Sequence, residues 1–506
     1  MKLYILYEKV DIELPGKLIL SKYAISQSSV IKEVILGYYR ELLPEILLSN
    51  NPEKIIVLFK DIYKTSESLI DILNLKGVKY LALHEEEHRL FNFYDTDDFY
   101  NDLISFKYFK KIRNLLTLSK KTKELFLKRF NKINSNNITI VGNPKYDYIK
   151  LIKKNHINKK NFIKKNYILF ALTESFFKTF KFYYHVKKNN LDLNSIDQVF
   201  FAQYNLKEMY CQHLYIKEKL KLLIKIAKEN PKEIFLLRPH PSEKENLNKL
   251  KKIFKKQKNI EVNLEGSIYD SILSSKLVIS GPSSSIMDSL ILEKPFLIFY
   301  DEKNSCHKFS YGMHPTTEFN EKFIKLNNEI LNLSSKEIEI TEKEKNLIIN
   351  YTNYETNSYE KIFHLIDTLT LIKKKQKFMN NLFFKMFFKP IINQMIVLKK
   401  KRIYGFNAFV IFREKIIYKI LRYAPYIFFR DHSSKNYFFR HIFKLILGTS
   451  DNKTPDETFH SGELEKINLK DFEFIKNILN NNLNFKDCSN IKLHNENKKI
   501  LLTKKI

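Results

Sequence analysis

The residues of this chain best suited to bind an anion are Arg238, His240 and Ser242, in the sequence RPHPS that follows the apolar run 233–237. A guanidinium binds a phosphate through two parallel hydrogen bonds, and an imidazole can donate another. The two prolines restrict the backbone on both sides of His240, and Ser242 with an acidic residue after it is typical of a helix N-cap. Two interpretations follow: a rigid turn between a strand and a helix, or a turn that directs His240 toward a ligand.

Three consecutive serines form a second polar group, after the apolar run 276–281. They are Ser283, Ser284 and Ser285, and they open a pattern of apolar residues at helical spacing. The N–H groups and the dipole of a helix start attract anions, and serine hydroxyls add donors. Serine is also an ordinary N-cap, so the serines alone are a weak signal. Together with Arg238 and His240 they predict a phosphate-binding site.

Carboxylates gather after two apolar runs in the first part of the chain. Glu85 and Glu86 belong to the sequence LHEEEH at 83–88, and Glu13 follows the run 2–8. A carboxylate within reach of a hydroxyl group can act as a general base. The alternatives for 83–88 are a solvated acidic loop, or a metal site that uses the two flanking histidines. For Glu13 the alternative is a turn that caps a helix.

The apolar runs of the sequence predict the strands and helices that would position these polar groups. Short apolar runs alternate with helical patterns up to residue 150, and the alternation starts again after a stretch rich in Lys and Asn at 150–166. Strands that alternate with helices indicate βαβ units and a parallel sheet. The predicted strands lie at 2–8, 54–59, 78–87, 115–119, 137–144, 167–172, 233–239, 259–264, 276–281 and 295–301.

The repeated pattern predicts an α/β protein with two Rossmann-like lobes and a basic, mainly helical C-terminal extension. The predicted boundaries are 1–150 for the first lobe, 151–370 for the second and 371–506 for the extension. In sheets of this kind ligands bind beyond the carboxyl ends of the strands. Every polar group above follows a predicted strand, so all of them are expected at such edges.

The formal net charge of +31 comes almost entirely from lysine. The chain is also rich in Ile, Asn, Phe and Tyr, and an AT-rich coding sequence produces that mixture without selection for binding. Five arginines fall between residues 402 and 440, which indicates a basic face near an acidic partner. A protein that binds single-stranded nucleic acid would place basic and aromatic residues together on a strand platform. The strands of this chain lack that pattern, so nucleic acid is not the favoured partner.

Basic and aromatic residues alternate without a strand pattern at 372–402 and 412–447. One interpretation is a helical appendage that packs on the lobes. The other is a peripheral contact of residues 372–447 with an anionic membrane surface, in which Phe and Ile enter the interface and Lys and Arg face the lipid head groups.

The cysteines and the N-terminus bear on the compartment. Cys211, Cys306 and Cys488 lie far apart and are odd in number, which predicts neither a disulfide nor a zinc site. This usage fits a reducing compartment. The N-terminal sequence does not predict a secretory signal, and no apolar run is long enough to predict a transmembrane span. A cytoplasmic protein is therefore expected, with peripheral contact to the inner membrane left open.

Taken in order, the motifs resemble those of a known group of proteins. RPHPSE, the serine cluster and EKPFLIFY at 293–300 resemble bacterial surface-carbohydrate biosynthesis proteins, which make capsule and lipopolysaccharide. In the first lobe the counterparts are E-L-x-x-K-L-x-L at 13–20, LHEEE, and VGNPKYD at 141–147. The group is similar to GT-B glycosyltransferases and to CDP-glycerol glycerophosphotransferases. The resemblance covers roughly residues 1–365.

The resemblance implies a metal-independent GT-B glycosyltransferase without a cofactor. Its first lobe would bind an acceptor, a polysaccharide or a lipid-linked sugar, and its second a nucleotide-activated sugar or polyol phosphate. Arg238, His240 and Ser242 would hold the donor phosphate together with Ser283, Ser284 and Ser285. Glu13 would act as the base, with Glu85 or Glu86 as the next candidates. The alternatives are a nucleotide-sugar epimerase of related fold, and a binding protein for nucleotide sugars or carbohydrates without turnover.

Overall fold

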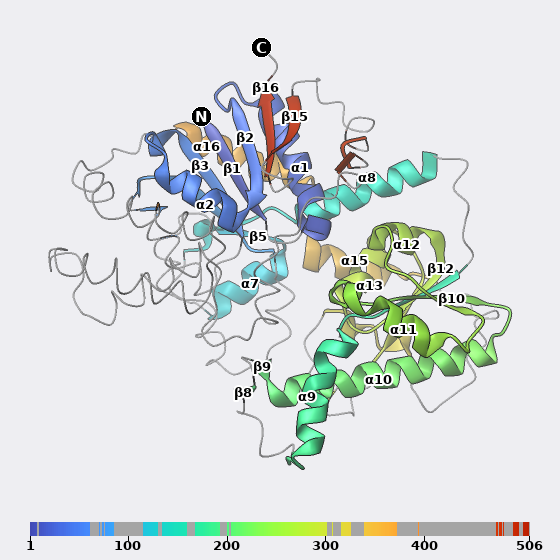
Figure 1. Ribbon diagram of the computed structural model, residues 1–506. Coiled ribbons are helices and arrows are strands. Elements are labelled where there is room, and N and C mark those ends of the chain that lie inside the picture. The colour runs from blue at the N-terminus through green and yellow to red at the C-terminus, as the bar shows by residue number, and fades with distance from the viewer. Residues whose placement is uncertain are drawn as a thin grey trace. The chain divides into compact units, whose positions relative to one another are not determined.

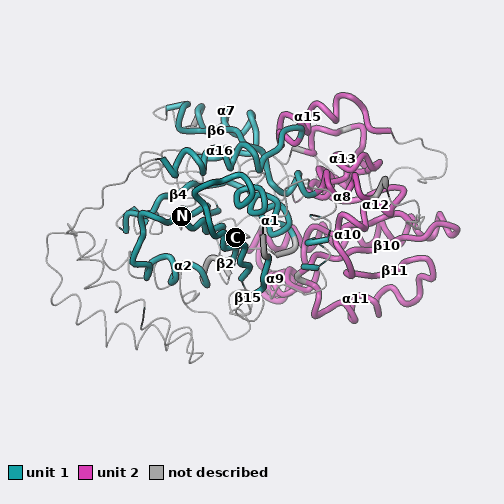
Figure 2. Tube along the Cα trace, turned by 90° about the horizontal axis from the view of Figure 1, so that it is seen from above, with its two compact units in different colours: residues 1–85, 97–148, 355–506 teal, residues 86–96, 149–354 magenta. Residues whose placement is uncertain are grey.

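The chain divides into two compact units, which Figure 2 shows in different colours. The first contains the described residues up to 85, those from 115 to 148 and those from 355 onward, and the second contains those from 149 to 354. The computed structural model describes residues 1–7, 10–60, 70, 73–74, 76–85, 115–129, 134–158, 167–192, 200–201, 204–300, 306, 315–324, 339–371, 393, 472–473, 475–477, 479, 489–494 and 499–504.

The first unit is built on an eight-stranded sheet in the order β15-β16-β2-β1-β3-β4-β5-β6. From β2 to β6 all neighbouring strands are parallel. These six strands are β1 (Lys2–Tyr7), β2 (Glu33–Tyr38), β3 (Ile55–Lys60), β4 (Lys79–Leu83), β5 (Leu115–Thr117) and β6 (Ile138–Ile140). Their side chains are almost all buried, as expected for parallel strands covered on both faces.

Helices cover both faces of this sheet, with α1 (Val10–Gln27) and α16 (Ser358–Leu371) on one face and α2 (Tyr39–Leu48) on the other (Figure 1). Tyr23 of α1 packs edge-on against Tyr359 and Phe363 of α16. Among the described residues this unit also contains α7 (Lys120–Arg129) and the start of α8 (Pro144–Asn158), which runs from the first unit into the second.

The edge of this sheet beside β2 is completed by a hairpin from the far end of the chain. Strands β15 (Ser489–His494) and β16 (Lys499–Lys504) pair with each other, and β16 pairs antiparallel with β2. Ile500 and Leu502 of β16 are fully buried. The sequence analysis predicted neither these two strands nor β2.

The second unit holds a six-stranded parallel sheet in the order β11-β10-β7-β12-β13-β14. This is the order of the doubly wound nucleotide-binding fold. The strands are β7 (Tyr167–Ala171), β10 (Ile234–Arg238), β11 (Ile260–Val262), β12 (Ser275–Ser280), β13 (Phe296–Phe299) and β14 (Phe323–Ile324). All but β14 were predicted.

Helices and a short hairpin accompany the second sheet. Helices α9 (Phe176–Lys188) and α10 (Leu206–Glu229) lie side by side, and Phe182 and Val186 of α9 form a small core with Leu206, Met209 and Tyr210 (Figure 1). The remaining elements are α11 (Leu247–Phe254), α12 (Ile268–Ser274), α13 (Ser284–Ile291), α15 (Glu342–Thr352), β8 (Phe200–Phe201) and β9 (Tyr204–Asn205).

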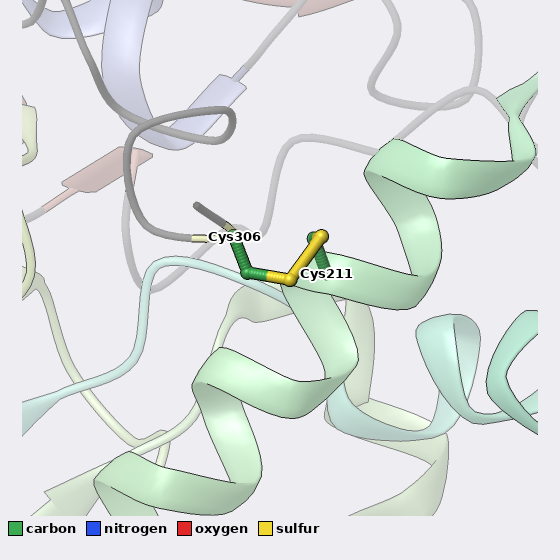
Figure 3. Close-up of a disulfide and its surroundings, with 2 residues drawn as sticks. All are labelled: Cys211 and Cys306. Carbon is green, nitrogen blue, oxygen red and sulfur yellow. A yellow bond between two sulfur atoms is a disulfide. The ribbon is translucent and has the colours of Figure 1, made fainter. Parts of the chain in front are cut away.

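A disulfide joins Cys211 of α10 to Cys306 (Figure 3). The expectation of a chain without a disulfide is therefore wrong. The two cysteines are 95 residues apart in sequence, so their spacing holds no sign that the chain returns to α10 after β13. The bond ties α10 covalently to the segment that follows the fifth strand of the second sheet.

The prediction of an α/β protein with two Rossmann-like parallel sheets is confirmed. Residues 372–447, which were expected to form basic helices or a membrane contact, lie outside the described residues except for residue 393. In the part of the chain that the structure describes, no helix combines the length and the apolar character needed to cross a membrane.

Candidate functional site

Four buried charged side chains form a cluster in the first unit. Lys17 Nζ lies 3.1 Å from Glu13 Oε2 and 2.6 Å from Glu85 Oε2, and Lys60 Nζ lies 3.0 Å from Glu13 Oε1. The side chain of Lys17 is 1% exposed, and those of Glu13 and Glu85 are 7% exposed. Charged groups are seldom buried unless they are paired, and such a cluster at a strand edge is a candidate site.

The topology of the first sheet brings this cluster together. Lys60 is the last residue of β3, Glu85 follows β4 by two residues, and Lys17 also donates to the carbonyl oxygen of Leu6 in β1, at 3.0 Å. Strand β1 lies between β2 and β3, so the chain reverses its direction of winding between β1 and β3. Ligands of open α/β sheets bind at the carboxyl edge beside such a switch point.

Helix α1 places Glu13 and Lys17 on one face, because residues four apart in a helix are neighbours. Helix α1 begins at Val10, so Glu13 lies inside the helix and not in a turn that caps it. Gly16 permits a close approach of α8: a Cβ atom there would lie 2.3 Å from the carbonyl carbon and oxygen of Pro144.

The electrostatics of the cluster single out Glu85. Burial, together with the neighbouring carboxylate of Glu13, raises the pKa of Glu85 to about 7, although the ammonium of Lys17 acts in the opposite direction. Burial also acts to lower the pKa of Lys17, but Glu85 and Glu13 outweigh it and raise that pKa overall. Glu85 can therefore exchange a proton near neutral pH while Lys17 stays charged.

The other residues of the sequence LHEEEH do not join this cluster in the described structure. His84 is fully buried, with its backbone N–H bonded to Leu116 O and its ring against Phe126 at 5.8 Å. Glu86 and His88 lie outside the described residues. Among the described residues no group of three His, Cys, Asp or Glu side chains has the arrangement of a metal site.

The serine cluster lies at the switch point of the second sheet, between β7 and β12. Ser283 is the N-cap of α13, and its hydroxyl lies 3.2 Å from that of Ser280, which also bonds to Ala171 O in β7 at 3.0 Å. Ser284 is exposed and Ser285 half-buried in the first turn of the helix. This helix start is open to solvent and suited to an anion.

The guanidinium group of Arg238 forms hydrogen bonds within the second unit. Its Nη1 donates to Glu265 O at 3.0 Å and to Ser271 Oγ at 3.1 Å, and its Nη2 donates to Gly266 O at 2.6 Å. The side chain is 9% exposed. These bonds fix the loop between β11 and α12, so the geometry favours a positioning role for Arg238 over the predicted direct contact with phosphate.

The sequence around His240 is anchored to the loop after β7. The backbone N–H of Glu243 bonds to His240 O at 2.8 Å, and the buried Glu243 carboxylate accepts from Ser175 Oγ and, at 2.8 Å, from the Phe177 N–H. Glu243 thus caps the start of α9 and holds the turn that carries His240, which is half-buried. Ser242 belongs to this turn, but its side chain lies outside the described ones.

A buried pair that could not be predicted from the sequence lies behind the serine cluster. Lys219 Nζ of α10 lies 3.7 Å from Glu174 Oε2 and 3.4 Å from Thr173 Oγ1, in the loop after β7. Burial lowers the pKa of Lys219. A Cβ atom on Gly281 would lie 2.3 Å from the Tyr215 hydroxyl oxygen and 3.0 Å from Lys219 Nζ. The turn that leads into α13 is therefore packed directly against this pair.

The sequence VGNPKYD at 141–147 has a structural role within the first unit. Asn143 Oδ1 accepts from the Lys145 N–H at 2.9 Å at the start of α8. Asp147 Oδ2 accepts from the Tyr359 N–H at 3.2 Å at the start of α16. The motif thus joins α8 to α16, and its Pro144 lies against Gly16 of α1.

No family model matches the chain, and no curated protein matches it either. Solved structures do. A UDP-GlcNAc 2-epimerase from Methanocaldococcus jannaschii, in complex with UDP-GlcNAc and UDP, is 14% identical with a TM-score of 0.45, over 73% of this chain and all of the epimerase. A UDP-GlcNAc 2-epimerase from Neisseria meningitidis is 13% identical with a TM-score of 0.44, over 72% and 99% of the chains.

A variant of the wall teichoic acid polymerase TagF is 13% identical with a TM-score of 0.43, over 73% of this chain and 89% of the polymerase. These neighbours are two epimerases and a teichoic acid polymerase, and all three TM-scores lie below 0.5. At these identities the likeness concerns the fold, and the fold class itself follows from the two parallel sheets described above.

Proposed function

We propose that the chain is a metal-independent, GT-B-type transferase. It moves a sugar or a polyol phosphate from a nucleotide-activated donor to a hydroxyl group of a cell-surface polysaccharide or a lipid-linked acceptor. The observation that carries the proposal is the buried cluster of Glu13, Lys17, Lys60 and Glu85 at the switch point of the first sheet. Burial in this cluster raises the pKa of Glu85 to about 7, so its carboxyl group can take up a proton near neutral pH.

Glu85 is the proposed proton acceptor for the acceptor hydroxyl, in place of Glu13. Both oxygens of Glu13 pair with lysines at about 3 Å, so this carboxylate is already engaged in two ion pairs. Glu85 pairs with Lys17 through Oε2, and its pKa is matched to neutral pH. Glu13 and Lys60 are positioning residues in this account. Glu13 pairs with Lys17, and Lys60 pairs with Glu13 and balances part of its negative charge near Glu85.

The second unit supplies the donor site. The first turn of α13, with Ser284 and Ser285, binds the phosphate that leaves with the nucleotide, and His240 contacts the same ligand. His240 follows β10 and the serines follow β12, with β7 between them, so two strand spacings of about 5 Å each separate their strands. A nucleotide is large enough to reach both, whereas a lone phosphate is not.

A thermal-shift screen tests the donor site. At least one CMP-, CDP-, UDP- or GDP-linked compound is expected to raise the melting temperature by several degrees, because a ligand that binds only the folded chain stabilises it. Ser284→Glu should abolish this shift: it repels phosphate, while a glutamate at a helix start leaves the fold intact. Ser284→Ala, which keeps the backbone N–H groups, is the control. Protection by no compound, or equal protection of Ser284→Glu, contradicts the proposal.

A further inference from the structure

The outer face of helix α9 carries Phe180 and Tyr184, which are exposed although the ring of Phe180 also lies edge-on to that of His213 in α10, with centroids 5.5 Å apart. Its inner residues Thr179, Phe182 and Val186 are buried, and the latter two pack in the small core shared with α10. On the outer side Phe180 is 45% and Tyr184 is 56% exposed. The two rings stack one turn apart, with centroids 6.4 Å from each other and ring planes at 29°. A single exposed apolar side chain needs no explanation, but a stacked pair on one face does.

The charge on α9 has one sign. The helix contains four lysines and no acidic residue in thirteen positions, and Lys181, Lys187 and Lys188 are exposed around the two rings. The high lysine content of the whole chain does not explain this, because the neighbouring helix α10 intersperses its lysines with Glu208, Glu218 and Glu229. Soluble surface helices usually mix both signs.

The basic surface continues onto α11. Lys249 of α11 lies over the ring of Phe177 in the first turn of α9, 5.4 Å from its centroid. Helix α11 in turn exposes Ile253, at 48%, between the exposed lysines 251, 252, 255 and 256. Two neighbouring helices of the second unit therefore each surround exposed apolar side chains with ammonium groups.

We infer that the outer face of α9 binds the surface of an anionic lipid bilayer. Phe180 and Tyr184 enter the boundary between head groups and acyl chains, and Lys181, Lys187 and Lys188 contact the lipid phosphates. An anionic bilayer fits both features of this surface, because the two rings gain by leaving water for an apolar layer and the lysines pair with lipid phosphates. The residues of this surface are all described and do not belong to the basic stretch 372–447.

The absence of tryptophan from the chain makes a direct experiment possible. Tyr184→Trp introduces a single indole on the outer face of α9, and Ile234→Trp introduces one at another exposed position of the same unit, 52% exposed. With vesicles of phosphatidylcholine and phosphatidylglycerol, we expect the emission of Tyr184→Trp to shift to the blue and that of Ile234→Trp to stay unchanged. Vesicles of phosphatidylcholine alone should shift neither.

Charge variants complete the test. Replacement of Lys181, Lys187 and Lys188 by Gln should weaken binding to the anionic vesicles about five-fold for each lysine, which corresponds to about 1 kcal/mol each. The matched control replaces the exposed lysines 221, 225 and 228 of α10 and should leave binding unchanged. An unshifted Tyr184→Trp spectrum, equal loss in both lysine sets, or displacement by an acidic polysaccharide that binds in the absence of lipid would overturn the inference. Nucleotide protection measured on the same variants shows separately whether the donor site is intact.

Discussion

Glu85 and Lys17 form the closest ion pair of the buried cluster, at 2.6 Å, and yet the pKa of the carboxyl group is raised and not lowered. Desolvation is the main cause, because the side chain lies almost wholly inside the unit and burial disfavours the charged form. The second carboxylate, on Glu13, adds to it. Near neutral pH Glu85 is therefore present in both its protonated and its ionised form. The ammonium groups of Lys17 and Lys60 favour the ionised form.

The raised pKa of Glu85 predicts how stability changes with pH. Between about pH 4.5, where this side chain titrates in the unfolded chain, and about pH 7, the folded protein holds a proton that the unfolded chain has lost. The free energy of unfolding should therefore fall as pH rises through this window, by at most about 1.4 kcal/mol per pH unit from this group.

Urea unfolding of the natural chain and of Glu85→Gln at several pH values measures this contribution. The difference in unfolding free energy, natural chain minus variant, should decrease from pH 5 to pH 7. If Lys17 instead dominated and lowered the pKa of Glu85, the side chain would be ionised in both states above about pH 4.5, and the difference would stay nearly constant from pH 5 to pH 7. A constant difference would contradict the account of Glu85.

Part of the site is visible in the sequence. Glu13 and Lys17 stand four apart in E-L-x-x-K, and Glu85 follows an apolar run, so a carboxylate site after the strands could be predicted. Lys60 and Lys219 carry no such signal, because each joins its cluster only when distant strands and helices meet. Arg238 shows the reverse case: its type and position suit phosphate, but the loop after β11 engages it.

At the scale of elements, the packing of α1 on the start of α8 depends on Gly16. In Gly16→Ala the new methyl group would lie 2.3 Å from the Pro144 carbonyl, a contact that backbone must move to relieve. We expect a loss of about 1–3 kcal/mol or more in the free energy of unfolding, even though alanine is the better helix former.

Gly266→Ala is the matched control for that substitution. Gly266 has a φ of +70°, and an added methyl group there would meet no atom within 4 Å, so only backbone strain of about 1 kcal/mol is expected. Thermal or urea unfolding measures the loss of stability in both variants, and we expect the larger loss in Gly16→Ala. If Gly16→Ala is as stable as the natural chain, α1 and α8 do not pack as described.

The strands that the sequence analysis predicted are those with continuous apolar runs, which parallel strands buried on both faces require. Strand β2 was missed because its sequence EVILGY continues the apolar spacing of α1 without a strong break. The hairpin β15–β16 was missed because its strands mix lysine with apolar residues and obtain their burial only from contact with β2. Tertiary context, more than local propensity, decides such edge strands.

For the whole molecule, each of the two units carries candidate residues at the switch point of its own parallel sheet. The first offers a carboxyl group with a pKa of about 7, and the second offers an exposed helix start after β12. The two sites are complementary in chemistry, a proton acceptor and an anion site. A group transfer from a nucleotide to a hydroxyl group requires both.

The transfer reaction itself tests the central claim most directly. With a nucleotide-linked donor that protects the chain in the thermal-shift screen, and with a polysaccharide acceptor, release of the nucleotide should depend on the acceptor and should rise with pH up to about 7. Glu85→Gln should lower the turnover rate by about 10²–10⁴-fold. Glu45→Gln, which alters an ion pair with Lys499 elsewhere in the first unit, should leave the rate unchanged. Unchanged turnover in Glu85→Gln, or conversion of the donor without any acceptor, as in an epimerase, would contradict the account.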